Sequence, residues 1–104
     1  MVRVGLLNPT AIMILLTTHI KASNDQVSCD LAGEAAILDL KNGIYYGLDP
    51  VGARIWELIQ APTEVATIVS QLLDEYDVDA TQCEQDTLAL LGQLEERNLI
   101  EVVD

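Results

Sequence analysis

A tight turn between two apolar runs constrains this chain more than any other feature of its sequence. Residues 35–50 read AAILDLKNGIYYGLDP, and Asn42-Gly43 separates the two runs. A two-residue type I′ hairpin needs a positive φ angle at both central positions, so this pair predicts such a hairpin. The residues that should then face one another across the strands are Leu40 and Tyr45, Asp39 and Tyr46, and Ile37 and Leu48.

The hairpin belongs to a predicted three-stranded antiparallel sheet. Gln26 to Leu31 alternates in polarity and is expected to form the first strand, with Ala35 to Leu40 as the second and Ile44 to Leu48 as the third. Because strand side chains alternate between faces, one face should collect Ile37, Ile44, Tyr46 and Leu48, and the other Leu38, Leu40 and Tyr45. Helices should cover one face, and the sequence leaves open which tyrosine points to the core.

Two helices are predicted directly after the sheet. Asp49 suits the N-cap of the first helix and Pro50 its first turn. Pro62 should end this helix, and Thr63 can cap the next one. The apolar residues at helical spacing are Val51, Ile55, Leu58 and Ile59 in the first helix, and Val65, Ile68, Val69, Leu72 and Tyr76 in the second. We expect both sets to be buried.

A third helix and an apolar tail complete the chain. The helix should begin at Asp79 with Gln82, or at Thr81 with Glu84, and run to about Asn98. Residues 99–103 should add a short strand or pack on the core. No repeat or long linker divides the 104 residues, so the chain is one domain. Strands leading into a three-helix unit indicate an α+β fold of the winged helix-turn-helix type.

The third predicted helix carries one leucine more than a single buried face needs. At 100° per residue its buried stripe collects Cys83, Thr87, Leu90, Leu91 and Leu94. Leu88 lies more than about 90° from the centre of that stripe, flanked by Glu84 and Glu95. It is either an isolated exposed leucine, which is common, or one wall of a groove together with Leu91.

The first 20 residues are the least assigned part of the domain. The run AIMILL at 11–16 is short for a signal peptide and lacks a good cleavage pattern. It is also too short to span a bilayer, which needs about 20 apolar residues. We therefore expect residues 11–20 to form a β-strand or to cover apolar surface, and residues 1–10 to be an extension of little functional weight.

Charge excludes the usual ligand of a winged helix. Seventeen acidic residues against five basic ones give a formal net charge of −12. Binding to nucleic acid depends on lysines and arginines that neutralise phosphates, and the third predicted helix has only Arg97 against four acids, Glu84, Asp86, Glu95 and Glu96. Neither nucleic acid nor a membrane is an expected partner, although much of the acidity is explained by a solvated surface.

Few residues are available for metal binding or catalysis. His19 is the only histidine, and the two cysteines, Cys29 and Cys83, lie far apart in sequence and in no paired motif. One histidine and two distant cysteines do not form a metal site, and no serine or cysteine has a histidine partner other than His19. We therefore expect no cofactor, no metal, no enzymatic activity, and reduced thiols in a cytoplasmic protein.

The pattern of residues 24–103 resembles the PqqD family. The resemblance is carried by LDLKNGIYYGLDPVGARIWELI, then EVATIVSQLLDEY, then DVDATQCEQDTLALLGQLEERNLIE, and its most specific part is YYGLDPVGARIWEL at 45–58. More narrowly, the chain is similar to the small leader-peptide-binding proteins of lasso peptide biosynthesis, whose domain is called a RiPP recognition element. The resemblance implies that the chain binds the leader segment of a ribosomally made precursor peptide.

The resemblance also implies a binding mode and partners. In this family the leader adds as an antiparallel strand to the third strand of the sheet, beside the third helix. The positions carried over are Ile44, Tyr45, Tyr46, Gly47 and Leu48 from the strand, and Glu84, Leu88, Leu91 and Glu95 from the helix. Precursors are presented to a cysteine-protease-like leader peptidase, and a macrolactam synthetase acts afterwards. The alternative is an acidic winged-helix adaptor in another peptide-modification pathway.

Overall fold

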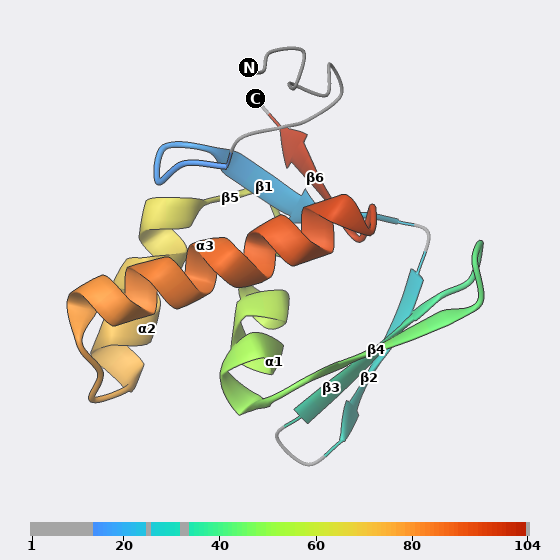
Figure 1. The fold of residues 1–104 in the computed structure, drawn as a ribbon, viewed down its shortest axis with the longest axis horizontal. Helices are drawn as coiled ribbons and strands as arrows, with labels where there is room; N and C mark the ends of the chain where they lie inside the picture. Colours follow the sequence, from blue (N-terminus) through green and yellow to red (C-terminus); the bar gives the residue numbers. More distant parts are fainter. Residues whose placement is uncertain (1–13, 25, 32–33, 104) are drawn as a thin grey trace, which may run out of the picture.

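The computed structural model describes residues 14–24, 26–31 and 34–103 of the chain. The expectations for residues 1–10, and for the start of the apolar run that follows them, lie outside the described residues. Nine elements follow in the order β1-β2-β3-β4-α1-β5-α2-α3-β6, and they form the mixed α+β arrangement expected from the sequence (Figure 1).

A three-stranded antiparallel ribbon precedes the helices, as predicted. It contains β2 (Gln26–Leu31), β3 (Glu34–Asp39) and β4 (Ile44–Leu48), in the spatial order β2-β3-β4. The hairpin that joins β3 to β4 projects away from the helices, whereas the opposite end of β4 leads directly into α1 (Figure 1). The chain also enters β2 from β1 at the hairpin end, where Gln26 pairs with Asp39.

The predicted two-residue turn and its register are wrong. Asp39 pairs with Ile44, so residues 40–43 form a four-residue loop. Gly43 has a positive φ of 67°, but Asn42 does not, and a type I′ turn requires both. The observed pairs are Leu38 with Tyr45, Ile37 with Tyr46, Ala36 with Gly47 and Ala35 with Leu48.

The side chain of Asp39 explains why the longer loop forms. Its carboxylate accepts hydrogen bonds from the backbone N–H of Lys41 (3.0 Å) and from the Asn42 side-chain amide (2.8 Å). The backbone N–H of Gly43 donates to the Asp39 carbonyl at 2.8 Å. The Asn42 bond is the main cause of a lowered pKa at Asp39. Asp39 thus competes for the backbone groups that a two-residue turn would use, as aspartates commonly do in loops.

The side chains nevertheless lie on the predicted faces of the ribbon. The register differs from the predicted one by two residues, and strand side chains alternate with a period of two, so the faces are unchanged. Ile37 and Leu48 are buried and Tyr46 is half-buried, whereas Leu38 and Tyr45 are exposed on the other face. Tyr46 is therefore the tyrosine that points toward the helices.

The three predicted helices are present, and two of the caps are confirmed. They are α1 (Pro50–Leu58), α2 (Val65–Glu75) and α3 (Ala80–Glu96). Asp49 caps α1 by accepting from Gly52 N–H at 2.8 Å, and Asp79 caps α3 by accepting from Gln82 N–H at 2.9 Å. Of the two signatures offered for α3, the Asp79 signature is the one used.

The prediction that Thr63 caps α2 is wrong. Thr63 lies in the short strand β5 (Thr63–Glu64), which pairs with β1 (His19–Ala22). Its hydroxyl donates to the carbonyl oxygens of Leu58 and Ala61, and the N-cap position belongs to Glu64, whose side chain makes no cap hydrogen bond. Pairing with β1 satisfies this backbone in place of a cap.

A second antiparallel sheet, in the order β5-β1-β6, ties the two ends of the described chain together. Its third strand is β6 (Ile100–Val103), which confirms the expected strand in the apolar tail. The strand expected within residues 11–20 begins late, at His19, while Ile14 and Leu16 pack against the core. Both expectations for the described part of this segment therefore hold.

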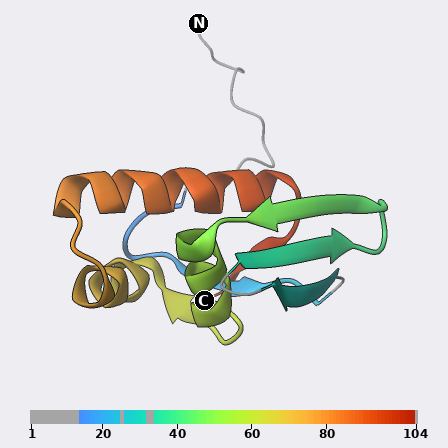
Figure 2. The same cartoon turned by 90° about the horizontal axis from the view of Figure 1, so that it is seen from below.

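The core lies between the helices and the two sheets (Figures 1 and 2). Apolar residues with no exposed surface come from five elements or their ends: Ile20, Ile37, Ile59, Val65, Ile68, Leu91 and Leu94. Val65, Ile68, Val69 and Leu72 of the second helical stripe are buried as predicted, but Tyr76 is half-buried. In the first stripe, Ile55 and Ile59 are buried, Leu58 is half-buried and Val51 is 40% exposed. The residues of α1 therefore divide between the core and an accessible surface.

The two cysteines and the histidine considered for metal binding or catalysis lie within the described residues, 14–24, 26–31 and 34–103. Cys29 is exposed and Cys83 buried, and both are free thiols. His19 is an ordinary exposed residue of β1. No cluster of potential metal ligands occurs in the described segments, and none of their helices is both long and apolar enough to cross a membrane.

One ion pair joins α1 to α2. The Arg54 guanidinium donates to both oxygens of Glu75, at 2.8 Å to Oε1 and 2.7 Å to Oε2, and contacts Glu57 at 3.1 Å. The hydrogen bonds from Arg54, with a further one from Gln71, lower the pKa of Glu75 to about 2. The reference pKa of the carboxyl is 4.5, so the folded state favours the ionised form.

We predict that Glu75→Gln removes a pH-dependent part of the stability. A carboxyl whose pKa is lowered by folding stabilises the protein above its unfolded pKa, and this stabilisation disappears as pH falls through the folded value. The thermal midpoint of Glu75→Gln should therefore lie below that of the wild type near neutral pH, and the gap should close between pH 4.5 and about 2. A constant gap, or the same profile for the neighbouring Asp74→Asn change, would contradict this assignment.

Candidate functional site

The outer edge of β4 is a row of backbone groups without a strand partner among the described residues. β4 is the terminal strand of the order β2-β3-β4, and its described partner is β3. Alternate N–H and C=O groups of an edge strand point away from the sheet, where another extended chain can pair with them. β4 is five residues long, which limits this edge to a short segment.

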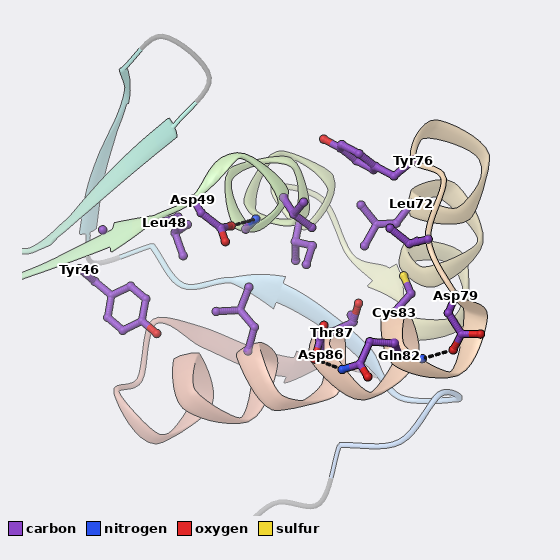
Figure 3. A pocket seen from close by; sticks show the side chains of 16 residues that line it. Tyr46, Leu48, Asp49, Leu72, Tyr76, Asp79, Gln82, Cys83, Asp86 and Thr87 are labelled. Atoms are coloured by element: carbon purple, nitrogen blue, oxygen red, sulfur yellow. Dashed lines mark hydrogen bonds between the residues drawn. The ribbon is translucent and has the colours of Figure 1, made fainter.

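An open cavity of about 690 Å³ lies beside this edge. β4 and the start of α1 form one wall, α3 forms the opposite wall, and the end of α2 with the loop after it closes one end (Figure 3). The lining residues are Tyr46, Gly47, Leu48, Asp49, Val51, Gly52, Ile55, Leu72, Tyr76, Val78, Asp79, Gln82, Cys83, Asp86, Thr87 and Leu90. Most of these side chains are apolar, as is usual for a ligand site.

Tyr46 fixes the ribbon against the C-terminal half of α3. Its hydroxyl donates to the side-chain oxygen of Gln93 at 2.7 Å, and the Arg97 guanidinium lies 5.1 Å from the centre of its ring. That distance permits a cation–π contact. The wall of the cavity is therefore held in place at Tyr46, while the part near the N-terminus of α3 stays open.

Gly47 allows close approach to the centre of β4. A Cβ atom placed on Gly47 would have only the Tyr45 ring nearby, with the nearest ring atom at 3.5 Å. That ring comes from the exposed face of the ribbon, where Tyr45 is 66% exposed. A second backbone can therefore approach Gly47 without meeting a side chain of that residue.

Three carboxylates lie among the cavity residues, and no lysine, arginine or histidine does. Asp49 and Asp79 each use one oxygen to cap a helix, and Asp86 accepts from the Gln82 side chain at 2.8 Å. The described ion pairs involve Arg54, Glu57 and Glu75, so they leave these three carboxylates without a cation. The cavity is thus apolar along its length and negative at its rim.

The five strand positions carried over from the resemblance divide between three surfaces. Tyr46, Gly47 and Leu48 line the large cavity. Ile44 lines a separate hollow of about 250 Å³ next to Arg97. Tyr45 lies on the opposite face of the ribbon, where it can reach the edge of β4 but not the cavity.

The four helix positions carried over from the resemblance lie away from the cavity. Leu91 is fully buried in the core, and Leu88 is half-buried and packs on the core. Glu84 and Glu95 are half-buried, and none of the four lines the cavity. Leu88 and Leu90 are about 200° apart on a helix, so they occupy opposite flanks. The interpretation of Leu88 and Leu91 as a groove wall does not match this cavity.

Some residues of α3 line the cavity although they are not among the expected peptide-binding residues. Leu90 belongs to the predicted buried stripe, and Gln82 and Asp86 belong to its polar flank. Their spacing of four residues, 82-86-90, places them on one side of the helix. That spacing is a sequence signal for a shared flank, but it does not say which flank β4 approaches.

Comparison with known proteins connects this architecture to a family. Residues 34–100 match the family described as coenzyme PQQ synthesis protein D (PqqD). The solved structure of TbiB1 in complex with the TbiA(beta) leader peptide is 37% identical in sequence, with a TM-score of 0.73. The alignment covers 78% of this chain and 94% of TbiB1. No curated protein matches the chain.

A second solved structure has the same fold at lower identity. It is lasso peptide synthetase B1 complexed with the leader peptide, with 23% identity and a TM-score of 0.70. That alignment covers 79% of this chain and 96% of the other. The family match spans β3, β4, β5 and all three helices. The expected resemblance to PqqD-like RiPP recognition elements is confirmed: the chain belongs to the PqqD family.

Proposed function

We propose that this protein binds the leader segment of a ribosomally made precursor peptide by β-strand addition to β4. The observation that carries the proposal is the unpaired edge of β4 beside a cavity of about 690 Å³. An added strand would pair with the edge through its backbone and send alternate side chains toward the cavity. The TbiB1 structure, which holds the TbiA(beta) leader peptide, supports this role.

The groove accounts for both affinity and selectivity of such a complex. Backbone pairing is available to any extended peptide, so it gives little discrimination among sequences. Discrimination comes from side chains that fill the apolar part of the cavity, formed by Val51, Ile55, Val78 and Leu90. Short interfaces depend on a few buried anchors more than on area. We therefore propose a leader with one or two large apolar residues in its paired stretch.

We further propose that the protein delivers the bound precursor to a cysteine-protease-like leader peptidase, before a macrolactam synthetase acts on the released core. In this role it is a cytoplasmic binding protein and not a catalyst. A delivery protein needs a second contact surface, and the outer face of the ribbon offers one. We define this outer face as Val27, Leu38, Leu40 and Tyr45, which are 53%, 43%, 61% and 66% exposed.

The outer face has the properties of an interface core. Val27, Leu38 and Tyr45 are direct neighbours across the three strands. Exposed apolar patches mark contact surfaces. The four residues of the outer face are apolar in a protein of net charge −12, and Glu34 lies on the same face at the far end of β3. A leader strand added to β4 would extend the same face, so the peptidase could contact the adaptor and the peptide together.

Backbone methylation of the peptide tests strand addition. Each residue of a synthetic TbiA(beta) leader peptide is N-methylated in turn, and binding is measured by fluorescence anisotropy. Because only alternate N–H groups of an added strand point to β4, methylation should weaken binding at every second position of the paired stretch. Loss at consecutive positions, or at none, would argue against an added strand.

A pair of leucines on α3 tests which flank of the helix meets the peptide. Leu90 and Leu88 are both half-buried and both pack on the core, but only Leu90 lines the cavity. We expect Leu90→Ala to weaken leader binding by about 1 kcal/mol or more, at least about fivefold in Kd. Leu88→Ala should lower the thermal midpoint similarly and leave Kd unchanged. The reverse order of the two Kd values would place the groove on the other flank.

A substitution on the outer face separates delivery from binding. Leu38→Lys should leave the Kd for the leader unchanged, because Leu38 points away from the cavity. It should slow cleavage of the precursor by the peptidase by about tenfold at limiting adaptor, since an interface core tolerates a charge poorly. The control is Leu73→Lys, an exposed leucine of α2 outside this face. Equal cleavage rates for the wild type and Leu38→Lys would exclude the outer face as the docking surface.

A further inference from the structure

We propose that the groove selects peptides by the position of their positive charge, with a basic side chain at the N-terminal end of the strand that pairs with β4. This inference rests on the proposed function and adds a charge requirement to it. It combines three observations: the direction of β4, the placement of three carboxylates, and the location of the nearest arginine.

The direction of β4 fixes which end of a bound peptide meets the cavity. β4 runs from Ile44, at the projecting hairpin, to Leu48, which leads through Asp49 into α1. An antiparallel peptide therefore has its N-terminal end beside Leu48 and its C-terminal end beside Ile44. Leu48 and Asp49 line the cavity across from α3 (Figure 3).

All three carboxylates line the cavity beside Leu48, and none lines the smaller hollow beside Ile44. Asp49 lies on the β4 side, and Asp79 and Asp86 lie on α3 and its N-terminal junction, on the opposite side of the cavity (Figure 3). Each has one oxygen beyond the bond described above, and none is paired with a cation among the described residues. A lysine or arginine side chain from the peptide can reach this rim along the apolar wall, keeping its charged end at the surface.

The other end of the groove has a different charge. Arg97 lies over the Tyr46 ring and shares the smaller hollow with Ile44, Asp39 and Glu96. A basic residue at the C-terminal end of the paired strand would approach this arginine. That hollow pairs Arg97 with two carboxylates, whereas the large cavity has three carboxylates and no basic side chain. A basic residue is therefore attracted less strongly at the Ile44 end than at the Leu48 end.

The effect of the three cavity carboxylates on binding can be distinguished from the long-range attraction caused by the net charge of −12. All basic peptides are attracted to such a protein at long range. Moving a charge along five paired residues displaces it by about 16 Å, at about 3.3 Å per residue. The Debye length is about 8 Å at physiological ionic strength, so the three carboxylates distinguish the two positions even though the net attraction does not.

The test uses two peptides of identical composition. Both contain the TbiA(beta) leader segment, with a pair of lysines placed either directly before or directly after the stretch that pairs with β4. We expect the first peptide to bind about fivefold more tightly, from about 1 kcal/mol of surface ion pairing. Raising the salt from about 0.1 M to about 1 M should remove most of this preference, since the Debye length falls from about 10 Å to about 3 Å.

A matched pair of variants locates the effect. Asp86→Asn should reduce the preference for the first peptide by about twofold, and Asp74→Asn, which removes the same charge from an exposed site on α2 outside the cavity, should leave it unchanged. Asp86 is chosen because Asp49 and Asp79 also cap helices. Asp86→Lys changes the charge by two units and should remove most of the preference.

The outcomes separate this inference from the proposed function. If both peptides bind equally and the N-methylation pattern persists, strand addition stands and the charge requirement is wrong. If neither binds, a displayed library of short random peptides is selected on the immobilised protein, and enriched sequences should carry lysine or arginine before their apolar anchor. Enrichment without that bias overturns the inference alone, and the absence of any enriched peptide overturns both.

Discussion

The contact between Tyr46 and α3 determines how the rest of this structure can be used. The ribbon is joined to the helices at one end only, through Asp49, and its hairpin projects outward. The hydrogen bond from Tyr46 to Gln93 and the position of Arg97 over the ring hold the strand at the C-terminal half of α3. Toward the N-terminus of α3 the two elements leave a cavity between them. Ile37 and Leu48 pack the ribbon into the core, and the Tyr46 contact fixes the position of β4 relative to α3.

The two flanks of α3 contact different parts of the molecule. Leu91 and Leu94 enter the core, and Leu88 packs beside them. Leu90 and Asp86 face the cavity. The second sheet fixes this helix from behind, because β6 follows α3 directly and pairs with β1. A rigid scaffold that carries an accessible edge strand fits a protein that binds extended peptides, and the acidic surface limits unwanted pairing of such edges by mutual repulsion.

Local chemistry allowed much of this fold to be predicted. Asp49 and Asp79 cap helices through bonds to residues three positions away, and Pro50 suits the first turn of α1 through its fixed φ angle, so all three roles depend on the local sequence. The faces of the ribbon were predictable because strand side chains alternate. The turn was not, because the Asp39 side chain competes for the loop backbone. Thr63 was misassigned because its partner strand, β1, lies more than forty residues away in the chain.

The sequence by itself determined the order of the ribbon strands and the three helices, the caps of α1 and α3, and the face on which each ribbon side chain lies, since these follow from spacing and short-range bonds. The family was indicated by the resemblance of its motifs. Only the tertiary structure decided that Tyr46, and not Tyr45, faces α3, and that Leu90, and not Leu88, lines the cavity. A helical wheel gives the angle between two leucines but not the direction from which a distant strand approaches. That direction is set by packing between segments that are far apart in the chain.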